Sequence, residues 1–385
     1  MATPIQRTRL VHGQPSWRLA NDQVEAFVTQ LGGHLGPVTF ARRTRKIQPF
    51  SVAPWAEGQI DPSLPAIIKA LRGDFFCLPF GGNEMRYRGE NHPVHGETAN
   101  ARWKFESLTT EGEQTVLHLS LTTKIRSGHV DKILMLMRGQ NVIYSKHVIS
   151  GMRGRMNLGH HAMLKFPEAP HSGALSTSGF IYGQVFPATF EAPERRGYSS
   201  LRPGAEFDSL ESVPALNGGT ADLTRYPARR GFEDLVMIVS EPKVPFAWET
   251  VTFPRERYLW FALKNPNVLH ETVFWISNGG RHYPPWNGRH VNVLGIEDVT
   301  AYFHYGLADS AGKNPIAAKG VPTCLTLSPA KPTVVPYIMG VAEIPAGFDR
   351  VNTIETCPGR NSVRFHSASG KKTEATVSVD FLRVS

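Results

Sequence analysis

Prolines and glycines interrupt this chain so often that long helices do not fit between them. The sequence has 29 prolines and 35 glycines among 385 residues, and these are the residues that most often end helices and form turns. Between them lie short runs in which apolar and polar residues alternate, the two-residue period of a strand with one buried face. The pattern therefore favours a fold made of many strands and turns.

Several segments carry this strand pattern. Residues 116–123 place Leu117, Leu119 and Leu121 on one face, and residues 130–149 predict two strands joined by the turn Arg138-Gly139-Gln140-Asn141. The pattern predicts further strands at residues 235–240, 259–263, 272–276, 291–296 and 375–384. Only residues 65–71 predict a short helix, after the turn-forming Asp-Pro-Ser at 61–63.

Strands predominate from end to end, without the strand–helix alternation that builds parallel sheets. We therefore expect an all-β fold, a large antiparallel sandwich, and a single domain over residues 1–385, since no repeat or clear boundary divides the sequence. Residues 191–230 are rich in Pro, Arg, Gly and Ser and lack periodicity. They predict a long surface excursion that could cover a site.

The charge and the cysteines limit the classes of partner and compartment. The net charge is +9, but the basic residues are scattered and no nucleic-acid recognition motif accompanies them, so we expect no nucleic-acid partner. An acidic or phosphorylated sugar is another interpretation of the charge. Cys77, Cys324 and Cys357 form no disulfide pattern. With no apolar leader and no run long enough to cross a membrane, these features predict a cytoplasmic protein.

Nucleotide and metal motifs are missing from the sequence. The segment 306–313 has one residue too many for a phosphate-binding loop, and the glycines at 32, 33 and 36 have the wrong spacing for a dinucleotide site. His160 and His161 are adjacent on a predicted strand, so their side chains point to opposite faces and cannot both bind one ion. We expect neither a metal nor a cofactor.

Three parts of the sequence carry residues suited to acid–base chemistry. Residues 71–103 contain Arg72 and His95 within a glycine-rich loop system, residues 157–166 contain the pair His160-His161, and Glu297 follows an apolar run. Imidazoles that act on oxygen and a carboxylate that takes a proton are what the reversible opening of a cyclic sugar needs. The wide spacing means that the fold must assemble any such site.

The order of these features resembles the galactose mutarotase (aldose 1-epimerase) superfamily, over about residues 24–305. The features that carry the resemblance are Leu31-Gly32-Gly33, Arg72-Gly73 before an apolar strand, Pro-Val-His95-Gly with Trp103 eight residues on, a histidine on a central strand, and Gly295-Ile-Glu297. The resemblance implies a large antiparallel β-supersandwich in which the sugar lies across a concave sheet. No cofactor is implied.

The resemblance also implies roles for four residues. His161 would be the general acid toward the ring oxygen, with His160 as the second candidate, and Glu297 would remove the proton from the anomeric hydroxyl. His95 would support the ring or its hydroxyls, and Arg72 would hydrogen-bond the sugar. The residues after His95 and around His161 differ from the usual family pattern, which indicates a divergent member.

Further residues are candidates for binding substrate: His160, Asn83, Asp234, His282 and Trp286. Most have a structural alternative. Arg72 could bind backbone carbonyls, Asn83 could fill a left-handed turn, and Asp234 could cap a turn. Trp286 could stack on a sugar face or shield the core, while Glu297 could form a surface salt bridge.

The sequence thus predicts an aldose 1-epimerase-like isomerase, a monomer or homodimer that acts on a small sugar. Two alternatives remain open. One is a non-catalytic carbohydrate-binding protein on the same scaffold, and the other is an isomerase or lyase of an unusual or acidic sugar.

Overall fold

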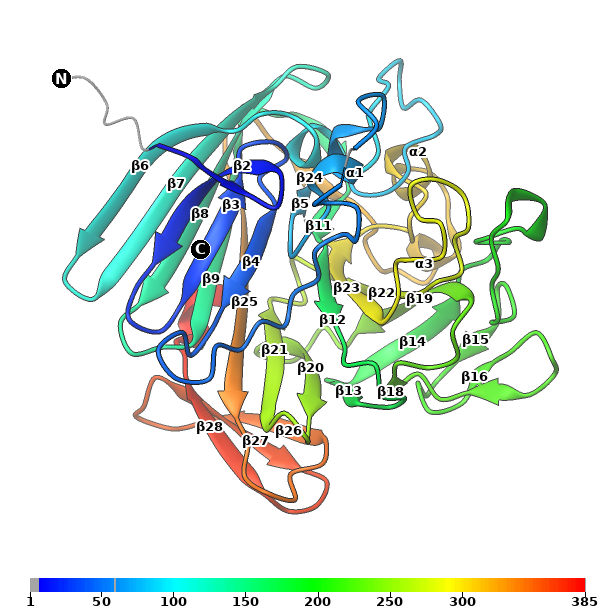
Figure 1. The fold of residues 1–385 in the computed structure, drawn as a ribbon. Helices are drawn as coiled ribbons and strands as arrows, with labels where there is room; N and C mark the ends of the chain where they lie inside the picture. Colours follow the sequence, from blue (N-terminus) through cyan, green and yellow to red (C-terminus); the bar gives the residue numbers. More distant parts are fainter. Residues whose placement is uncertain (1–6, 59, 385) are drawn as a thin grey trace.

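Two large antiparallel sheets form the body of the molecule, seen in the computed structural model, which describes residues 7–58 and 60–384 (Figure 1). The nine-stranded sheet has the order β18 (Arg225–Tyr226), β13 (Gly173–Thr177), β20 (Ala247–Phe253), β21 (Tyr258–Lys264), β25 (Thr333–Glu343), β9 (Val142–Ser150), β8 (Gly128–Met137), β7 (Gln114–Thr123) and β6 (Lys104–Glu111). The eight-stranded sheet has the order β15 (Glu206–Phe207), β14 (Phe180–Val185), β19 (Phe232–Ser240), β22 (Glu271–Asn278), β23 (Val293–Thr300), β11 (Leu158–His160) and β5 (Phe76–Cys77), with β12 (Ala162–Lys165) also paired to β23.

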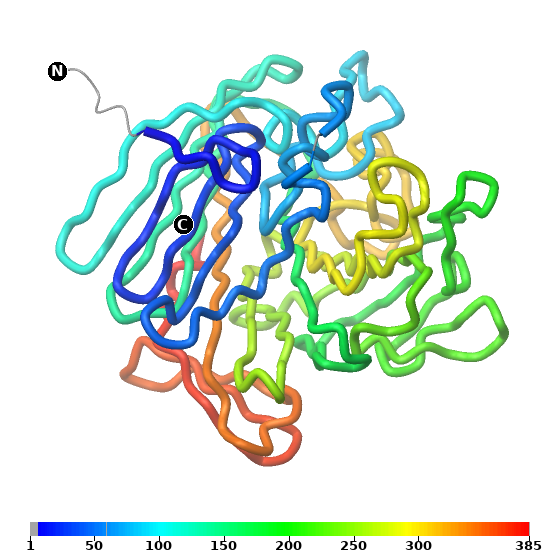
Figure 2. Tube along the Cα trace, viewed as in Figure 1, coloured from blue at the N-terminus to red at the C-terminus, as the bar shows by residue number. Residues whose placement is uncertain are grey.

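Smaller elements surround these sheets (Figure 2). The N-terminal sheet contains β1 (Arg9–Val11), β2 (Gln14–Ala20), β3 (Glu25–Thr29) and β4 (Leu35–Thr39), and the C-terminal sheet contains β26 (Val351–Thr356), β27 (Ser362–Ser367) and β28 (Lys372–Thr376). Two ribbons pair β10 (Gly154–Met156) with β24 (Leu325–Leu327) and β16 (Val213–Pro214) with β17 (Thr220–Ala221). The helices are α1 (Ala66–Ala70), α2 (Leu307–Ala311) and α3 (Pro315–Ala318), with 3₁₀ turns at η1 (Glu97–Ala99), η2 (Pro193–Arg195) and η3 (Val379–Leu382).

Alternation along the strands of the eight-stranded sheet separates two apolar clusters. Phe274 and Ile296 pack in the core between the two large sheets, together with Trp260 of β21. Val273, one position before Phe274, and Val299, three positions after Ile296, belong to a second cluster on the opposite face of the sheet. Because both faces are covered, all eight residues of β22 and of β23 are buried.

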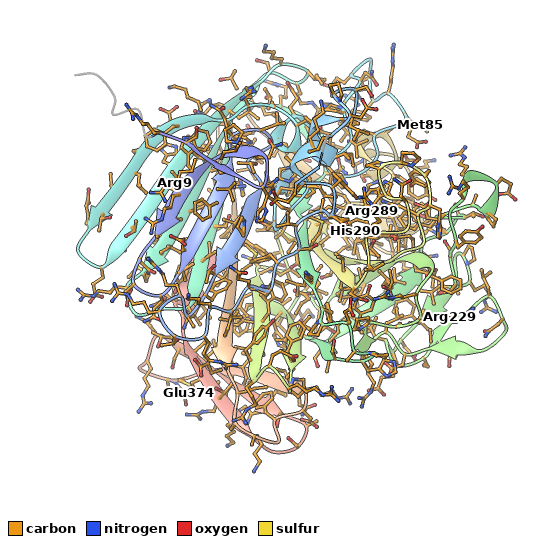
Figure 3. The ribbon with its side chains drawn as sticks, in the orientation of Figure 1. Arg9, Met85, Arg229, Arg289, His290 and Glu374 are labelled. Atoms are coloured by element: carbon orange, nitrogen blue, oxygen red, sulfur yellow. The ribbon has the colours of Figure 1, made fainter. Side chains whose placement is uncertain are left out.

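The C-terminal sheet covers the outer face of the nine-stranded sheet. Phe365 of β27 packs on Phe261 of β21, with ring centroids 5.2 Å apart. Figure 3 shows the side chains that fill the interior and places Glu374 at the periphery, on the exposed side of β28. The nine-stranded sheet is therefore buried on both faces over this region.

The structure confirms the antiparallel all-β sandwich predicted from the sequence. The segments predicted at 116–123, 130–149, 235–240, 259–263, 272–276 and 291–296 correspond to β7, β8 with β9, β19, β21, β22 and β23, and α1 lies within the predicted helix 65–71. Residues 191–230 contain only η2 and short strands, in agreement with a surface excursion. The α-helices in the described part of the chain have at most five residues, far fewer than the ~20 of a bilayer-spanning helix.

The strand predicted at residues 375–384 is corrected by the structure. β28 ends at Thr376, and residues 379–382 form the turn η3. The chain leaves the sheet because the amide of Ser378 donates to the hydroxyl of Tyr144 (2.9 Å) instead of to a neighbouring strand. Phe381 then packs edge-on against the ring of Tyr144.

Candidate active site

A cavity of about 100 Å³ lies on the face of the eight-stranded sheet that points away from the nine-stranded sheet. Its volume is well below the ~300–1,000 Å³ of pockets for drug-sized ligands, so it suits a small ligand. Polar and apolar side chains share the lining: Ile67, Ile68, Leu71, Phe75, Val94, His95, His161, Phe190, Leu235, Trp275, Arg281, Trp286, Glu297 and His304.

Strand geometry places Glu297 in the wall of this cavity. Glu297 lies on β23 opposite Val273 of β22, on the face that carries the second apolar cluster. Gly295 lies two positions earlier on the same face, where a Cβ atom would be 2.9 Å from Oε1 of Glu297 and 2.9 Å from Cβ of Trp275. A larger residue at position 295 would therefore displace the glutamate.

His161 lies between β11 and β12 and contacts Glu297 directly. The distance from its Nε2 to Oε1 of Glu297 is 3.2 Å, and the two side chains are 6% and 2% exposed. Oε2 of Glu297 and Nδ1 of His161 are buried and have no hydrogen-bond partner among the described residues. Each side chain thus keeps one polar atom free, although buried polar atoms are normally paired.

His95 enters the cavity from a tight turn. Its φ is +58°, and the next residue, Gly96, has φ +75° and packs so closely that a Cβ atom would be 2.0 Å from the carbonyl oxygen of Leu78. Glycine is the residue that fits both conditions. The turn places the ring of His95 edge-on to that of His161, with centroids 5.0 Å apart, and 4.8 Å from that of His304.

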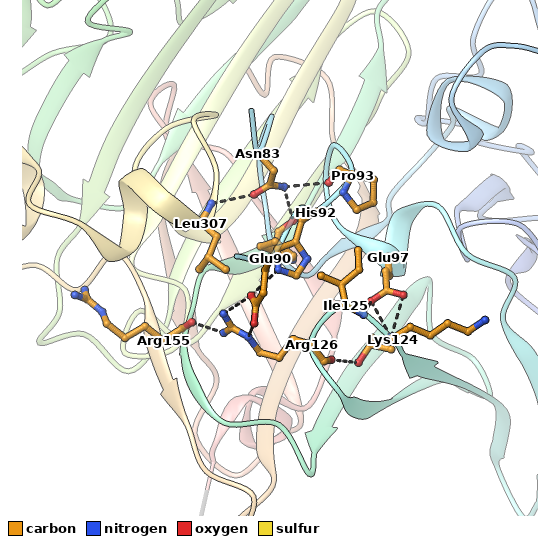
Figure 4. A network of polar contacts seen from close by, with 12 residues as sticks. Asn83, Glu90, His92, Pro93, Glu97, Lys124, Ile125, Arg126, Arg155 and Leu307 are labelled. Atoms are coloured by element: carbon orange, nitrogen blue, oxygen red, sulfur yellow. Dashed lines mark hydrogen bonds and ion pairs between the residues drawn. The ribbon is translucent and has the colours of Figure 1, made fainter. Parts of the chain in front are cut away.

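A polar network holds the loop that carries His95 (Figure 4). The amide of Leu307 donates to Oδ1 of Asn83 (2.9 Å), which joins this loop to the one after β23. Arg126 donates to both carboxylate oxygens of Glu90, at 2.9 and 2.6 Å, and Glu97 accepts hydrogen bonds from the backbone of residues 124 and 125. The loop is therefore fixed at several points before any ligand binds.

Burial determines the protonation of the residues in the cavity. It raises the pKa of Glu297 well above its usual range, with Arg281 opposing in part. Burial also lowers the pKa of His161 and of His95 well below the usual value, and lowers that of His304 to about 4. Near neutral pH the three imidazoles are therefore uncharged, and burial favours the protonated form of Glu297.

Arg281 and His304 line the cavity, although the sequence analysis did not select them. Nε of Arg281 donates to Oε1 of Glu191 at 2.6 Å, and the guanidinium carbon lies 4.6 Å from the ring centroid of Trp286. Both residues lie in loops that follow strands, where no two-residue period in the sequence predicts the direction of a side chain. The available signal for Arg281 was its position between the glycine pair 279–280 and an aromatic-rich segment.

The structure brings together four of the predicted site residues, His95, His161, Glu297 and Trp286. Trp286 is not an open stacking platform, since its ring packs edge-on against Trp55, with centroids 4.9 Å apart, and under the guanidinium of Arg281. Much of the Trp286 surface is therefore covered by neighbouring side chains, in agreement with the alternative that it shields the core.

Arg72 and His160 were predicted to bind substrate and lie outside the cavity, which corrects that expectation. The guanidinium of Arg72 donates to the carbonyls of residues 70, 11 and 12 at 2.8–3.0 Å and is fully buried. His160 points to the opposite face from His161, as adjacent strand residues do. Its Nδ1 lies 2.9 Å from Oδ2 of Asp74, and its ring stacks on Tyr337.

Asn83, Asp234 and His282 also lie outside the cavity, contrary to expectation. Asn83, with φ +56°, joins two loops as described above. Asp234 accepts hydrogen bonds from the amides of residues 200 and 201 and from the hydroxyl of Ser200, which attaches the 191–230 excursion to β19. His282 packs edge-on against Tyr198, with ring centroids 5.7 Å apart.

Within residues 7–58 and 60–384, no group of three or more His, Cys, Asp or Glu side chains is arranged to hold a metal ion. The imidazoles of the cavity pack against aromatic rings, with the ring centroid of Phe75 4.5 Å from that of His161 and 5.8 Å from that of His95.

Comparison with known proteins identifies the fold. The sequence matches no protein-family model and no curated protein. Among solved structures, it is similar to a proposed aldose 1-epimerase from Escherichia coli K12, with a TM-score of 0.58, 11% identity, and coverage of 86% of this chain and 100% of that one. A galactose mutarotase-like protein from Clostridium acetobutylicum gives a TM-score of 0.58 at 10% identity, covering 88% and 98%.

A galactose mutarotase related enzyme from Lactobacillus acidophilus gives a TM-score of 0.53 at 14% identity, covering 85% of this chain and 97% of that one. The chain therefore has the galactose mutarotase-like fold, as the sequence resemblance implied.

Proposed function

We propose that this protein is an aldose 1-epimerase, which interconverts the anomers of a small sugar. The observation that carries the proposal is the Glu297–His161 pair in the cavity wall, in contact at 3.2 Å, with one unpartnered polar atom on each side chain. A sugar that binds there presents its anomeric hydroxyl and ring oxygen as partners for those atoms.

The reaction needs two coupled proton transfers. Glu297, as carboxylate, takes the proton from the anomeric hydroxyl while protonated His161 gives one to the ring oxygen. The bond from C1 to the ring oxygen breaks as C1 and O1 form a carbonyl, and rotation about C1–C2 exposes the other face. Reversal of both transfers closes the ring as the second anomer.

Burial favours one end of this cycle. After ring opening, Glu297 is protonated and His161 is neutral, the same protonation states that burial favours for the two residues. The site therefore stabilises the pair in the state that accompanies the open-chain sugar. The state before ring opening, with Glu297 as carboxylate and His161 protonated, has the same net charge. The two states differ in the position of one proton, which can pass between the two side chains across their 3.2 Å contact.

The test is NMR exchange spectroscopy of anomers across neutral, acidic and phosphorylated aldoses. Wild-type protein should accelerate exchange of at least one sugar, and Glu297→Gln should lose that acceleration while binding the sugar within a few-fold. Glu271→Gln is the matched control, because Glu271 is a buried carboxyl with a raised pKa on the adjacent strand and does not line the cavity. Exchange that survives in Glu297→Gln would refute the proposal.

A non-catalytic carbohydrate-binding protein is the second candidate. It is favoured by the direct contact of Glu297 with His161, because a reacting sugar must part the two side chains. Saccharide binding by calorimetry without accelerated exchange of any sugar in the panel would select this function.

A further inference from the structure

The guanidinium of Arg281 is fixed at one nitrogen and open at the other two. Its Nε donates to Oε1 of Glu191 at 2.6 Å, and the hydroxyl of Tyr283 donates to the same carboxylate at 3.3–3.4 Å. No hydrogen bond joins the two amino groups of Arg281 to any described residue. A guanidinium has five N–H donors, so four of them lack a protein partner.

Aromatic rings hold this guanidinium in place. Its central carbon lies 4.6 Å from the ring centroid of Trp286, 5.2 Å from that of Trp275 and 5.4 Å from that of Phe190. The side chain is only 15% exposed. An arginine that is ordered by rings and by one carboxylate, yet keeps its amino groups unpaired, is preorganised to bind an acceptor in the cavity.

The remaining polar groups of the cavity do not repel an anion. Burial keeps the imidazoles of His95, His161 and His304 uncharged near neutral pH and, by raising the pKa of Glu297, favours the uncharged form of that carboxyl. Among the described residues that line the cavity, Arg281 is the only arginine or lysine. The pKa of Arg281 stays above its usual value because Glu233 and Glu191 outweigh the effect of burial.

We propose that the substrate is a sugar acid, whose carboxylate accepts two parallel hydrogen bonds from the amino groups of Arg281 while its ring reaches Glu297 and His161. This inference rests on the proposed function and names its substrate class. A planar carboxylate matches the planar fork of arginine. Trp275 connects the two subsites, since its ring centroid lies 5.8 Å from that of His161 and 5.2 Å from the guanidinium carbon of Arg281.

The first experiment compares sugars that differ only at C6. Anomer exchange is measured by NMR for D-galacturonate and D-glucuronate beside D-galactose, D-glucose and the two hexose 6-phosphates. Two hydrogen bonds to a charged group predict a kcat/KM for one uronate about 100-fold above that of its parent aldose. A parent aldose that reacts as fast as its uronate, or a 6-phosphate that reacts faster, would overturn the inference.

The second experiment uses Arg281→Lys, which keeps the positive charge and the pairing with Glu191 but removes the two parallel amino groups of the guanidinium. The ratio of kcat/KM for the uronate to that for the parent aldose should fall about tenfold or more. Arg72→Lys is the matched control, because Arg72 is also a buried arginine whose guanidinium makes hydrogen bonds, but it lies outside the cavity. A ratio that is the same in Arg281→Lys as in wild type would contradict the inference.

The two proposals can fail separately. Exchange of neutral aldoses without preference for uronates supports the proposed epimerase activity and overturns the proposal that the substrate is a sugar acid. The opposite result is uronate binding, measured by calorimetry, that weakens about tenfold in Arg281→Lys while no sugar shows anomer exchange. It supports a sugar-acid ligand and overturns the proposed epimerase activity. Thermal unfolding of each variant shows whether it is folded, and the wild-type comparison of substrates needs no variant.

Discussion

Glu297 and Asp298 are neighbours on β23, but their side chains lie on opposite faces of the eight-stranded sheet. Asp298 points into the core between the large sheets, where Oδ1 accepts from Lys264 (2.7 Å) and Thr272 (2.8 Å) and Oδ2 accepts from Tyr337 (2.7 Å). Glu297 points into the cavity, where only Oε1 has a partner. One carboxylate is fully paired and the other is not.

The adjacent histidines His160 and His161 also point to opposite faces of the sheet. His160 faces the core, with Nδ1 2.9 Å from Asp74 and its ring stacked 4.2 Å from that of Tyr337. His161 faces the cavity and contacts Glu297. Each of the two rings has one buried nitrogen without a partner, Nε2 of His160 and Nδ1 of His161, so the histidines differ in their surroundings and not in the number of their partners.

The difference shows that residue type alone does not identify a functional group in this fold. The same kinds of side chain occur on both faces, and so do unpartnered buried atoms, since Nε2 of His160 and Oε2 of Glu249 lie in the core. The distinction is that Glu297 and His161 line a cavity. A buried acid or base with unfilled hydrogen-bonding capacity destabilises the folded state. Under the proposed function, the sugar would supply the missing partners of Glu297 and His161 in the cavity.

The largest expected effect is on activity, and it should come from a substitution on the cavity face of the eight-stranded sheet. Glu297→Gln removes the group that accepts a proton from the sugar and should lower kcat/KM for anomer exchange by about 10²–10⁴-fold. The measurement is NMR exchange spectroscopy on the preferred sugar. A loss of less than about tenfold would mean that the unpaired carboxyl is not what distinguishes the cavity face.

The next largest effect is on stability, and it should come from a substitution on the core face of the same sheet. Lys264→Met should lower the free energy of unfolding by about 3–5 kcal/mol, because Asp298 and Glu249 would remain buried without their cation. Urea denaturation followed by circular dichroism measures this change. An unchanged midpoint would show that the core-facing cluster does not hold the sheets together.

Glu297→Gln should also raise the free energy of unfolding at pH 7, in contrast to its effect on activity. The raised pKa means that the folded state keeps a proton that the unfolded carboxyl releases above pH 4.5, so wild-type stability falls as pH rises through that range. Each tenfold difference in proton affinity between the two states corresponds to about 1.4 kcal/mol. Urea unfolding at several pH values should show the gain at pH 7 and its loss below the unfolded pKa, and a variant less stable than wild type at pH 7 would refute the account.

The smallest effect concerns Asp74, which touches both histidines. Its Oδ1 accepts from the amide of His161 at 3.1 Å, and its Oδ2 pairs with His160. Asp74→Asn keeps an acceptor for the amide, so we expect a loss of about 1 kcal/mol in unfolding free energy and a lower kcat with little change in KM. A KM effect larger than the kcat effect would show that Asp74 acts on binding instead of on the position of His161.

The strands and the opposite orientations of His160 and His161 could be predicted because a two-residue period is visible in sequence. The pairing of His161 with Glu297, 136 positions further on, came from the family resemblance. Arg72 could not be assigned from sequence, since its partners are backbone carbonyls of a distant loop. Arg281 was missed for a related reason, because its place in the cavity depends on Glu191 and on rings from separate segments.

The alternation on β23 also bears on how such a protein can change over evolutionary time. A substitution alters one side chain, whereas a one-codon insertion or deletion between Val293 and Glu297 would exchange the faces of every residue after it. Glu297 would then enter the core and Asp298 the cavity, so that folding and chemistry would be lost together. Lineages of this fold can therefore diverge in most of their residues, but within this strand the genetic record should contain replacements and almost no length changes.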